Sequence, residues 1–92
     1  MMFATKIHMN SGCEDSNKLL DIHSLYMIGY MEEQFYTKEK IHDYLKTHPN
    51  SIKADVFPYS FLVPMDGPDG EKYVQSTNNE SGLDTLMELP RE

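Results

Sequence analysis

The sequence predicts one small α+β domain: a mostly antiparallel sheet of four or five strands with a single helix packed on one face. Its 92 residues, 39% hydrophobic and 25% charged, have the composition of an ordinary globular domain. Stretches that alternate with a period of two or are rich in β-formers recur along the chain, and one stretch has a clear helical period. No linker or low-complexity run divides residues 1–92. A core of this size is modest, so a homodimer or a partner would add stability.

The first half of the chain contains one clear strand and one ambiguous segment. MFATKIHM alternates with a period of two and predicts a strand. One face of this strand would carry Phe3, Thr5, Ile7 and Met9. Residues 10–17 are dense in turn formers and predict a loop. The segment from Leu19 to Gly29 matches both a helix and a strand, and periodicity alone does not decide between them.

The helix is predicted at Lys38–Thr47. Thr37 is a favourable N-cap, and Glu39 lies in the first turn, where the helix dipole favours a carboxylate. Pro49 ends the pattern because proline cannot continue a helix. His42 is expected on the exposed side of this helix.

The second half of the chain predicts a β-rich segment, a hairpin and an anchored tail. SIKADVFPYSFLVPM is broken by Pro58 and Pro64, which indicates an edge strand or a bulge. DGPDG supplies turn residues before a short strand in EKYVQS. The tail, residues 78–92, is expected to run over the sheet. It would be held there by Leu83, Leu86 and Leu89. The predicted core consists of Ile7, Ile22, Ile41, Tyr44, Leu45, Val63, Val74 and Leu86.

The C-terminal stretch GEKYVQSTNNESGLDTLMELP resembles the signature of small bacterial proteins grouped as domain of unknown function family 3892. The positions that match its order are Gly70, Tyr73, Val74, Ser76, Leu86, Leu89 and Pro90. Upstream, YTKEKIHDYL is similar to the start of the family's helix. Gln75 and Thr85 depart from the pattern, which commonly has Arg and Asn there, so no role of that arginine carries over. The resemblance implies more about fold than about function, and it favours a strand between Leu20 and Ile28.

Negative charge is concentrated toward the C-terminal end of the chain. Residues 66–92 hold seven acids against Lys72 and Arg91, which gives −5 of the total net charge of −7. An acidic surface repels phosphate, which disfavours direct binding of nucleic acid or an anionic membrane, and it accelerates approach to a basic protein surface. Solubility is the alternative use of this charge.

We therefore expect a small non-enzymatic interaction module that binds a protein with a basic surface. A phage or mobile-element inhibitor of a host defence protein is the sharper version of this hypothesis. Tyr59 would act as an exposed anchor, because proline-containing edges are often open to partners. The candidate contact residues are Tyr59, Asp66, Asp69, Glu71, Glu80 and Asp84. The second hypothesis is a small-molecule or nucleotide-binding domain, with a pocket at a dimer interface. Its lining would include Tyr73, Gln75 and Asn79.

The sequence lacks motifs for catalysis, metals and cofactors, so none of these is expected. The soft metal ligands lack the close spacing of a zinc site. These ligands are His8, His23, His42, His48 and Cys13. Neither a nucleophile elbow nor a P-loop is present. A lone cysteine excludes an internal disulfide, no apolar run approaches the roughly 18 residues of a membrane span, and no signal peptide is recognisable. A cytoplasmic protein that enters no membrane is therefore expected.

Overall fold

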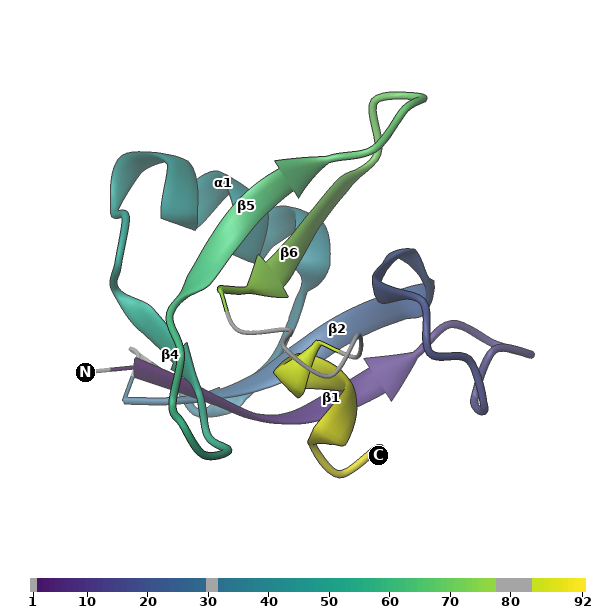
Figure 1. Cartoon of the computed structure of the whole chain (residues 1–92), viewed down its shortest axis with the longest axis horizontal. Helices are drawn as coiled ribbons and strands as arrows, with labels where there is room; N and C mark the ends of the chain where they lie inside the picture. The colour runs from purple at the N-terminus through teal and green to yellow at the C-terminus, as the bar shows by residue number, and fades with distance from the viewer. Residues whose placement is uncertain (1, 30–31, 78–83) are drawn as a thin grey trace.

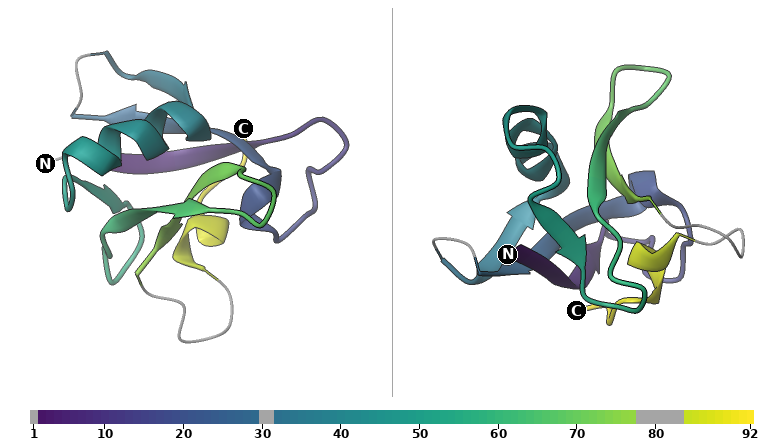
Figure 2. Two further views of the ribbon diagram at one scale, coloured as in Figure 1. Left: turned by 90° about the horizontal axis from the view of Figure 1, so that it is seen from above. Right: turned by 60° about the vertical axis from the view of Figure 1, so that its left-hand side comes forward.

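The computed structural model describes residues 2–29, 32–77 and 84–92 and shows a four-stranded sheet with a helix and a hairpin on one face (Figures 1 and 2). The sheet has the order β3-β2-β1-β4, with β4 parallel to β1 and the other neighbours antiparallel. Its strands are β1 (Met2–Met9), β2 (Ile22–Ile28), β3 (Gln34–Thr37) and β4 (Ile52–Ala54). The hairpin pairs β5 (Leu62–Asp66) with β6 (Lys72–Ser76). The α+β class is therefore confirmed, with two sheets instead of one.

The helix α1 (Lys38–Thr47) has the predicted bounds. Thr37 has an extended backbone, and its Oγ1 accepts a hydrogen bond from the backbone N–H of Lys40 at 3.3 Å. Ile41 and Leu45 are buried between the helix and the sheets. His42 is buried as well, so its predicted exposure is wrong. The hairpin packs against the face of α1 that carries His42. This contact cannot be predicted from the sequence of the helix alone, because the hairpin is a separate segment.

A bulge changes the buried face of β1. The pairing with β2 shifts register between Ala4 and Lys6. Met2 and Ala4 are therefore buried before the bulge, and Ile7 and Met9 after it. The prediction that a single alternation places Phe3 and Thr5 with Ile7 is wrong, because one extra residue reverses the faces.

The ambiguous segment forms a short 3-10 turn followed by a strand. The turn η1 (Leu19–Asp21) leads into β2, where Ile22, Leu25 and Met27 are buried. The strand alternative, which the family resemblance favours, is therefore right for Ile22–Ile28. Gly29 follows with φ of 79°, a backbone conformation that glycine adopts without steric strain.

The two prolines of the β-rich segment lie where a ladder tolerates them. Pro58 belongs to the loop between β4 and β5. Pro64 lies opposite Val74 in the two-stranded hairpin, so its missing N–H interrupts no central ladder. In the hairpin turn, Gly70 has φ of 84°, which explains a glycine there.

The described part of the tail completes the edge of the main sheet. A second 3-10 turn, η2 (Thr85–Glu88), buries Leu86, and Leu89 is buried directly after it. The backbone N–H of Ile7 donates to the carbonyl of Pro90 at 2.8 Å, and that of Glu92 donates to the carbonyl of Ile7 at 2.9 Å. The tail therefore lies along the same edge of β1 that β4 covers nearer the N-terminus. Leu83 lies outside the described residues.

The buried core joins all of these elements. Six of the eight predicted core residues are fully buried. They are Ile7, Ile22, Ile41, Leu45, Val74 and Leu86. Tyr44 is half-buried against this core. Val63 is also only half-buried, so its core assignment is wrong; Leu62 of β5 takes the inward position instead.

We expect the Leu86→Ala substitution to lower the free energy of unfolding by about 2–5 kcal/mol, because it opens a cavity in a fully buried site. Glu88→Ala, on the exposed side of the same turn, is the matched control and should change it by less than about 0.5 kcal/mol. Urea denaturation of both variants measures the difference. Equal stabilities would contradict the view that η2 belongs to the core.

Candidate functional site

The predicted partner-binding residues do not form one surface. Tyr59 lies in the loop between β4 and β5, whereas Asp66, Asp69 and Glu71 lie at the turn between β5 and β6. These two loops are at opposite ends of β5 (Figure 1). Glu80 lies outside the described residues. One contact surface made from the whole predicted set is therefore not what the fold presents.

The carboxylate of Asp84 points inward instead of toward a partner. Asp84 is only 7% exposed, and its oxygens accept hydrogen bonds from the backbone N–H groups of Ser76, at 2.9 Å, and Leu86, at 2.9 Å. Burial raises the pKa of Asp84, while those two hydrogen bonds act in the opposite direction. Its assignment to a partner-binding face is therefore wrong, because this side chain caps η2 and fastens it to the end of β6.

The carboxylates of the hairpin turn are already engaged within the fold. Glu71 Oε1 accepts a hydrogen bond from the backbone N–H of Asp69 at 2.8 Å. Asp66 Oδ1 lies 3.0 Å from Nε2 of His42. These side chains remain largely exposed, but their nearest roles are to shape the turn and to hold it to α1.

His42 is the centre of a polar joint between helix and hairpin. Its side chain is only 2% exposed and lies between two carboxylates, with Nδ1 3.4 Å from Asp43 Oδ1 and Nε2 facing Asp66. Lys72 of β6 reaches the same Asp43 oxygen at 2.9 Å. The hydrogen bond from Lys72, followed by that from His42, lowers the pKa of Asp43, and Asp43 in turn raises the pKa of Lys72. This arrangement positions the hairpin on α1.

The loop between β4 and β5 displays two aromatic rings. We call residues 55–60 the aromatic loop. Phe57 is 79% exposed and Tyr59 is 48% exposed, with their ring centres 6.2 Å apart in an edge-to-face arrangement. Tyr59 is therefore exposed as expected. Sequence reasoning misses Phe57, although it flanks the same Pro58 that pointed to Tyr59.

Backbone hydrogen bonds hold the aromatic loop in one shape. The N–H of Ala54 donates to the carbonyl of Ser60 at 3.0 Å and closes the base of the loop. Within it, the N–H of Tyr59 donates to the carbonyl of Val56 at 2.7 Å, and the N–H of Asp55 donates to the carbonyl of Ala4 in β1 at 2.9 Å. The loop is thus fixed to the main sheet, so its exposed rings are presented by a rigid support.

Tyr73 and Gln75, two of the alternative ligand residues, share the outer face of the hairpin. Val74 and Ser76 are buried, so Tyr73 and Gln75, which alternate with them, face away from the core and are half-buried. Asn79 lies outside the described residues. The outer face of a two-stranded sheet is not a concave pocket, so Tyr73 and Gln75 do not by themselves enclose a ligand.

A broad charged groove lies between η1, the start of α1 and the hairpin turn. It encloses about 780 Å³. Its charged lining consists of Lys18, Asp21, Lys38, Glu39, Glu71 and Lys72. Lys38 is buried, with its Nζ 3.1 Å from Glu39. This groove has the size of a small-molecule site, but its charges balance one another.

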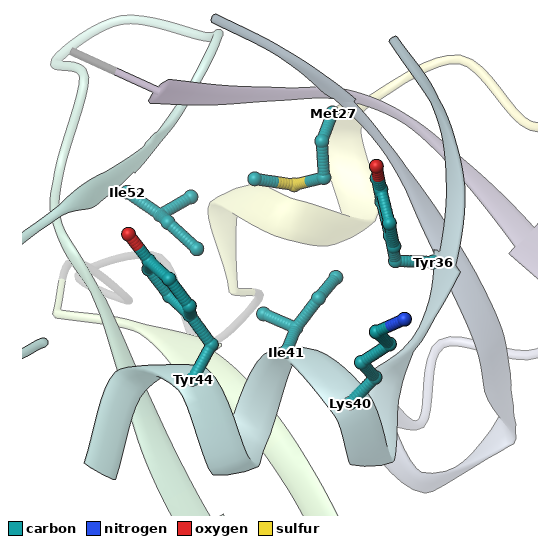
Figure 3. A pocket seen from close by; sticks show the side chains of 6 residues that line it. All are labelled: Met27, Tyr36, Lys40, Ile41, Tyr44 and Ile52. Carbon is teal, nitrogen blue, oxygen red and sulfur yellow. The ribbon is translucent and has the colours of Figure 1, made fainter. Parts of the chain in front are cut away.

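A smaller hollow lies between α1 and the main sheet (Figure 3). Its lining consists of Met27, Tyr36, Lys40, Ile41, Tyr44 and Ile52. Figure 3 shows Ile41 between the rings of Tyr36 and Tyr44, with Met27 on the opposite side. The volume is about 20 Å³, close to the space of a single water molecule, and the lining is almost wholly apolar. It is a gap in the packing and too small for a ligand.

Two further classes of site are not found in the described residues, and the comparisons give no relative. Among residues 2–29, 32–77 and 84–92, no three His, Cys, Asp or Glu side chains gather where they could hold a metal ion. No helix in these ranges has the length and apolar character needed to cross a bilayer. Neither a protein-family model, a curated protein nor a solved structure matches the chain. The resemblance to family 3892 therefore stays a prediction.

Asp84→Asn should preserve the fold, because an amide oxygen can still accept the hydrogen bonds from Ser76 and Leu86. Asp84→Ala removes the carboxylate that accepts both buried hydrogen bonds and should cost about 2–4 kcal/mol. Because the pKa of Asp84 is raised in the folded state, its stabilising contribution is largest below the unfolded value of about 3.9 and falls as pH rises through the folded value. As the pH rises from the unfolded pKa of Asp84 to its folded pKa, the wild type should therefore lose stability that the Asn variant keeps. Denaturant titrations from pH 3 to pH 7 measure this; an Asn variant as unstable as the Ala variant would contradict it.

Proposed function

We propose that the chain is a non-enzymatic protein-interaction module that uses the aromatic loop to anchor a partner with a basic surface. The observation that carries this proposal is the pair of exposed rings, Phe57 and Tyr59, on a loop held by backbone hydrogen bonds. The narrower form, a phage or mobile-element inhibitor of a host defence protein, and the resemblance to family 3892 belong to the same proposal.

Exposed aromatic side chains are effective anchors for protein binding. Aromatic residues dominate the few positions that carry most of the affinity of an interface. The Phe57 side chain is 79% exposed and makes little contact with the core. Its apolar surface is therefore removed from water only when another molecule covers it. Because the loop is already ordered, binding would lose little conformational entropy.

The charge of the chain favours a basic partner. Asp55 begins the aromatic loop and is exposed. The chain as a whole has a net charge of −7, so its carboxylates would speed the approach of a positively charged protein even where they do not contact it. The carboxylates of the hairpin turn would therefore attract the partner from a distance, while the rings of the aromatic loop would bind it directly.

The test compares wild type with a Phe57→Ser/Tyr59→Ser double variant in pull-downs from a bacterial lysate. Phe35→Ser is the control, because Phe35 is 37% exposed on the main sheet, away from the loop. We expect a protein that wild type and control retain, that the double variant loses, and that about 0.5 M salt weakens by screening the charges. Retention by the double variant, or no partner at all, would overturn the proposal.

A second candidate function is the binding of a small charged molecule in the groove near Lys18 and Lys38. Its volume of about 780 Å³ is the observation that favours it. A ligand that binds only the folded chain at a hundredfold excess over its Kd should stabilise the fold by about 2.7 kcal/mol. A thermal-shift screen of nucleotides and dicarboxylates measures this, with Lys18→Gln as the groove variant and Lys46→Gln as the matched control. A shift that survives Lys18→Gln would place the ligand elsewhere.

A further inference from the structure

Two histidines that are distant in sequence lie side by side on the open face of the main sheet. His8 of β1 and His23 of β2 are both exposed, and their ring centres are 5.7 Å apart with nearly perpendicular planes. The spacing of fifteen residues gives no metal-binding motif, so sequence reasoning did not pair them. Strand pairing brings them together.

Local backbone geometry explains why both rings face solvent. His8 lies opposite Ser24 in the antiparallel pair, and the register shifts between His8 and Met9. This second bulge places His23 beside His8 on the outer face, while its neighbours Ile22 and Ser24 are buried. Two paired strands hold both residues, so the separation of the rings is set by rigid elements.

One nitrogen of the pair is already oriented. His23 Nδ1 lies 3.2 Å from Ser24 Oγ, and in the tautomer in which Nδ1–H donates to that oxygen, Nε2 keeps a free lone pair for a metal ion. An imidazole whose other nitrogen is hydrogen-bonded is the usual form of a metal ligand. Within the described residues His8 makes ring contacts with His23 and Phe35 but no hydrogen bond, so it can rotate about χ2 without losing one.

The separation of the rings suits two nitrogens on one ion. A metal–nitrogen bond of about 2.1 Å places the ion about 3.2 Å from each ring centre. Two such distances span 5.7 Å when the angle at the ion is about 125°. Rotation about χ2 leaves a ring centre almost in place, so the pair can reach this geometry without backbone movement.

We propose that His8 and His23 bind one late divalent transition-metal ion, Cu²⁺, Ni²⁺ or Zn²⁺, on the outer face of the main sheet. Imidazole nitrogen suits these ions, whereas Mg²⁺ and Ca²⁺ require oxygen ligands. Two protein ligands leave further coordination positions for water. The site is therefore open, and it is independent of the aromatic loop.

The net charge of the chain also favours a cation: at −7, it attracts positively charged ions in general.

Calorimetric titration of the untagged full chain with Cu²⁺, Ni²⁺, Zn²⁺ and Mg²⁺ tests the site. We expect saturable binding that is tightest for Cu²⁺ and absent for Mg²⁺. His8→Gln and His23→Gln should each weaken Cu²⁺ binding by about tenfold or more, since a single imidazole then remains. Wild type, but neither variant, should also melt at a higher temperature in the presence of the metal.

His48→Gln is the matched control, because His48 is exposed and stacks on Tyr44 at the end of α1, away from the pair. It should bind Cu²⁺ as wild type does. The proposal is overturned if either pair variant keeps wild-type affinity, if His48→Gln weakens binding as much as they do, or if wild type shows no saturable binding. Melting temperatures without metal show that the variants are folded.

Discussion

The docking of residues 84–92 against β1 and β6 is the constraint on which the rest of the structure depends. The Asp84 carboxylate joins η2 to the last residue of β6, and the backbone of Ile7 pairs with the tail through Pro90 and Glu92. Arg91 extends this closure, because its guanidinium donates to the carbonyls of Glu14 and Ser16 at 2.8 Å each. The C-terminal residues thus hold the hairpin, the edge of the main sheet and the first loop in one arrangement.

This closure gives a structural meaning to most of the residues that resemble family 3892. Gly70 has a positive φ, Val74 and Leu89 are buried, and Pro90 accepts a hydrogen bond from β1. The backbone N–H of Ser76 donates a hydrogen bond to the Asp84 carboxylate. In this chain, these positions serve the closure of the fold. The signature therefore says little about function, which has to be sought on the surfaces that the closure leaves exposed.

Local sequence predicted the elements but not how they pack on one another. The bounds of α1 follow from Thr37 and the amphipathic period, and both are local signals. The bulge in β1 is invisible in sequence, because it depends on pairing with β2. His42 is buried because a hairpin that begins twenty residues later covers it and supplies Asp66. The sequence also shows that the tail is acidic. It does not show that the Asp84 carboxylate points inward, because this direction depends on the N–H groups of Ser76 and Leu86. The burial of His42 and the bulge in β1 were therefore missed because each depends on a segment distant in the sequence.

The aromatic loop and the polar joint lie at the two ends of one strand, and each makes the other more effective. At its far end β5 is tied to α1 through Asp66 and His42. At its near end the loop is closed by Ala54 and Ser60 and fastened to β1 through Asp55. A strand held at both ends cannot swing as a unit, so the exposed rings of the loop keep a fixed direction relative to the core. Phe57 is 79% exposed on this loop, so its apolar surface would be buried only by another molecule or by rearrangement of the loop. The carboxylates of the hairpin turn are likewise kept a full strand length from these rings, at the other end of β5.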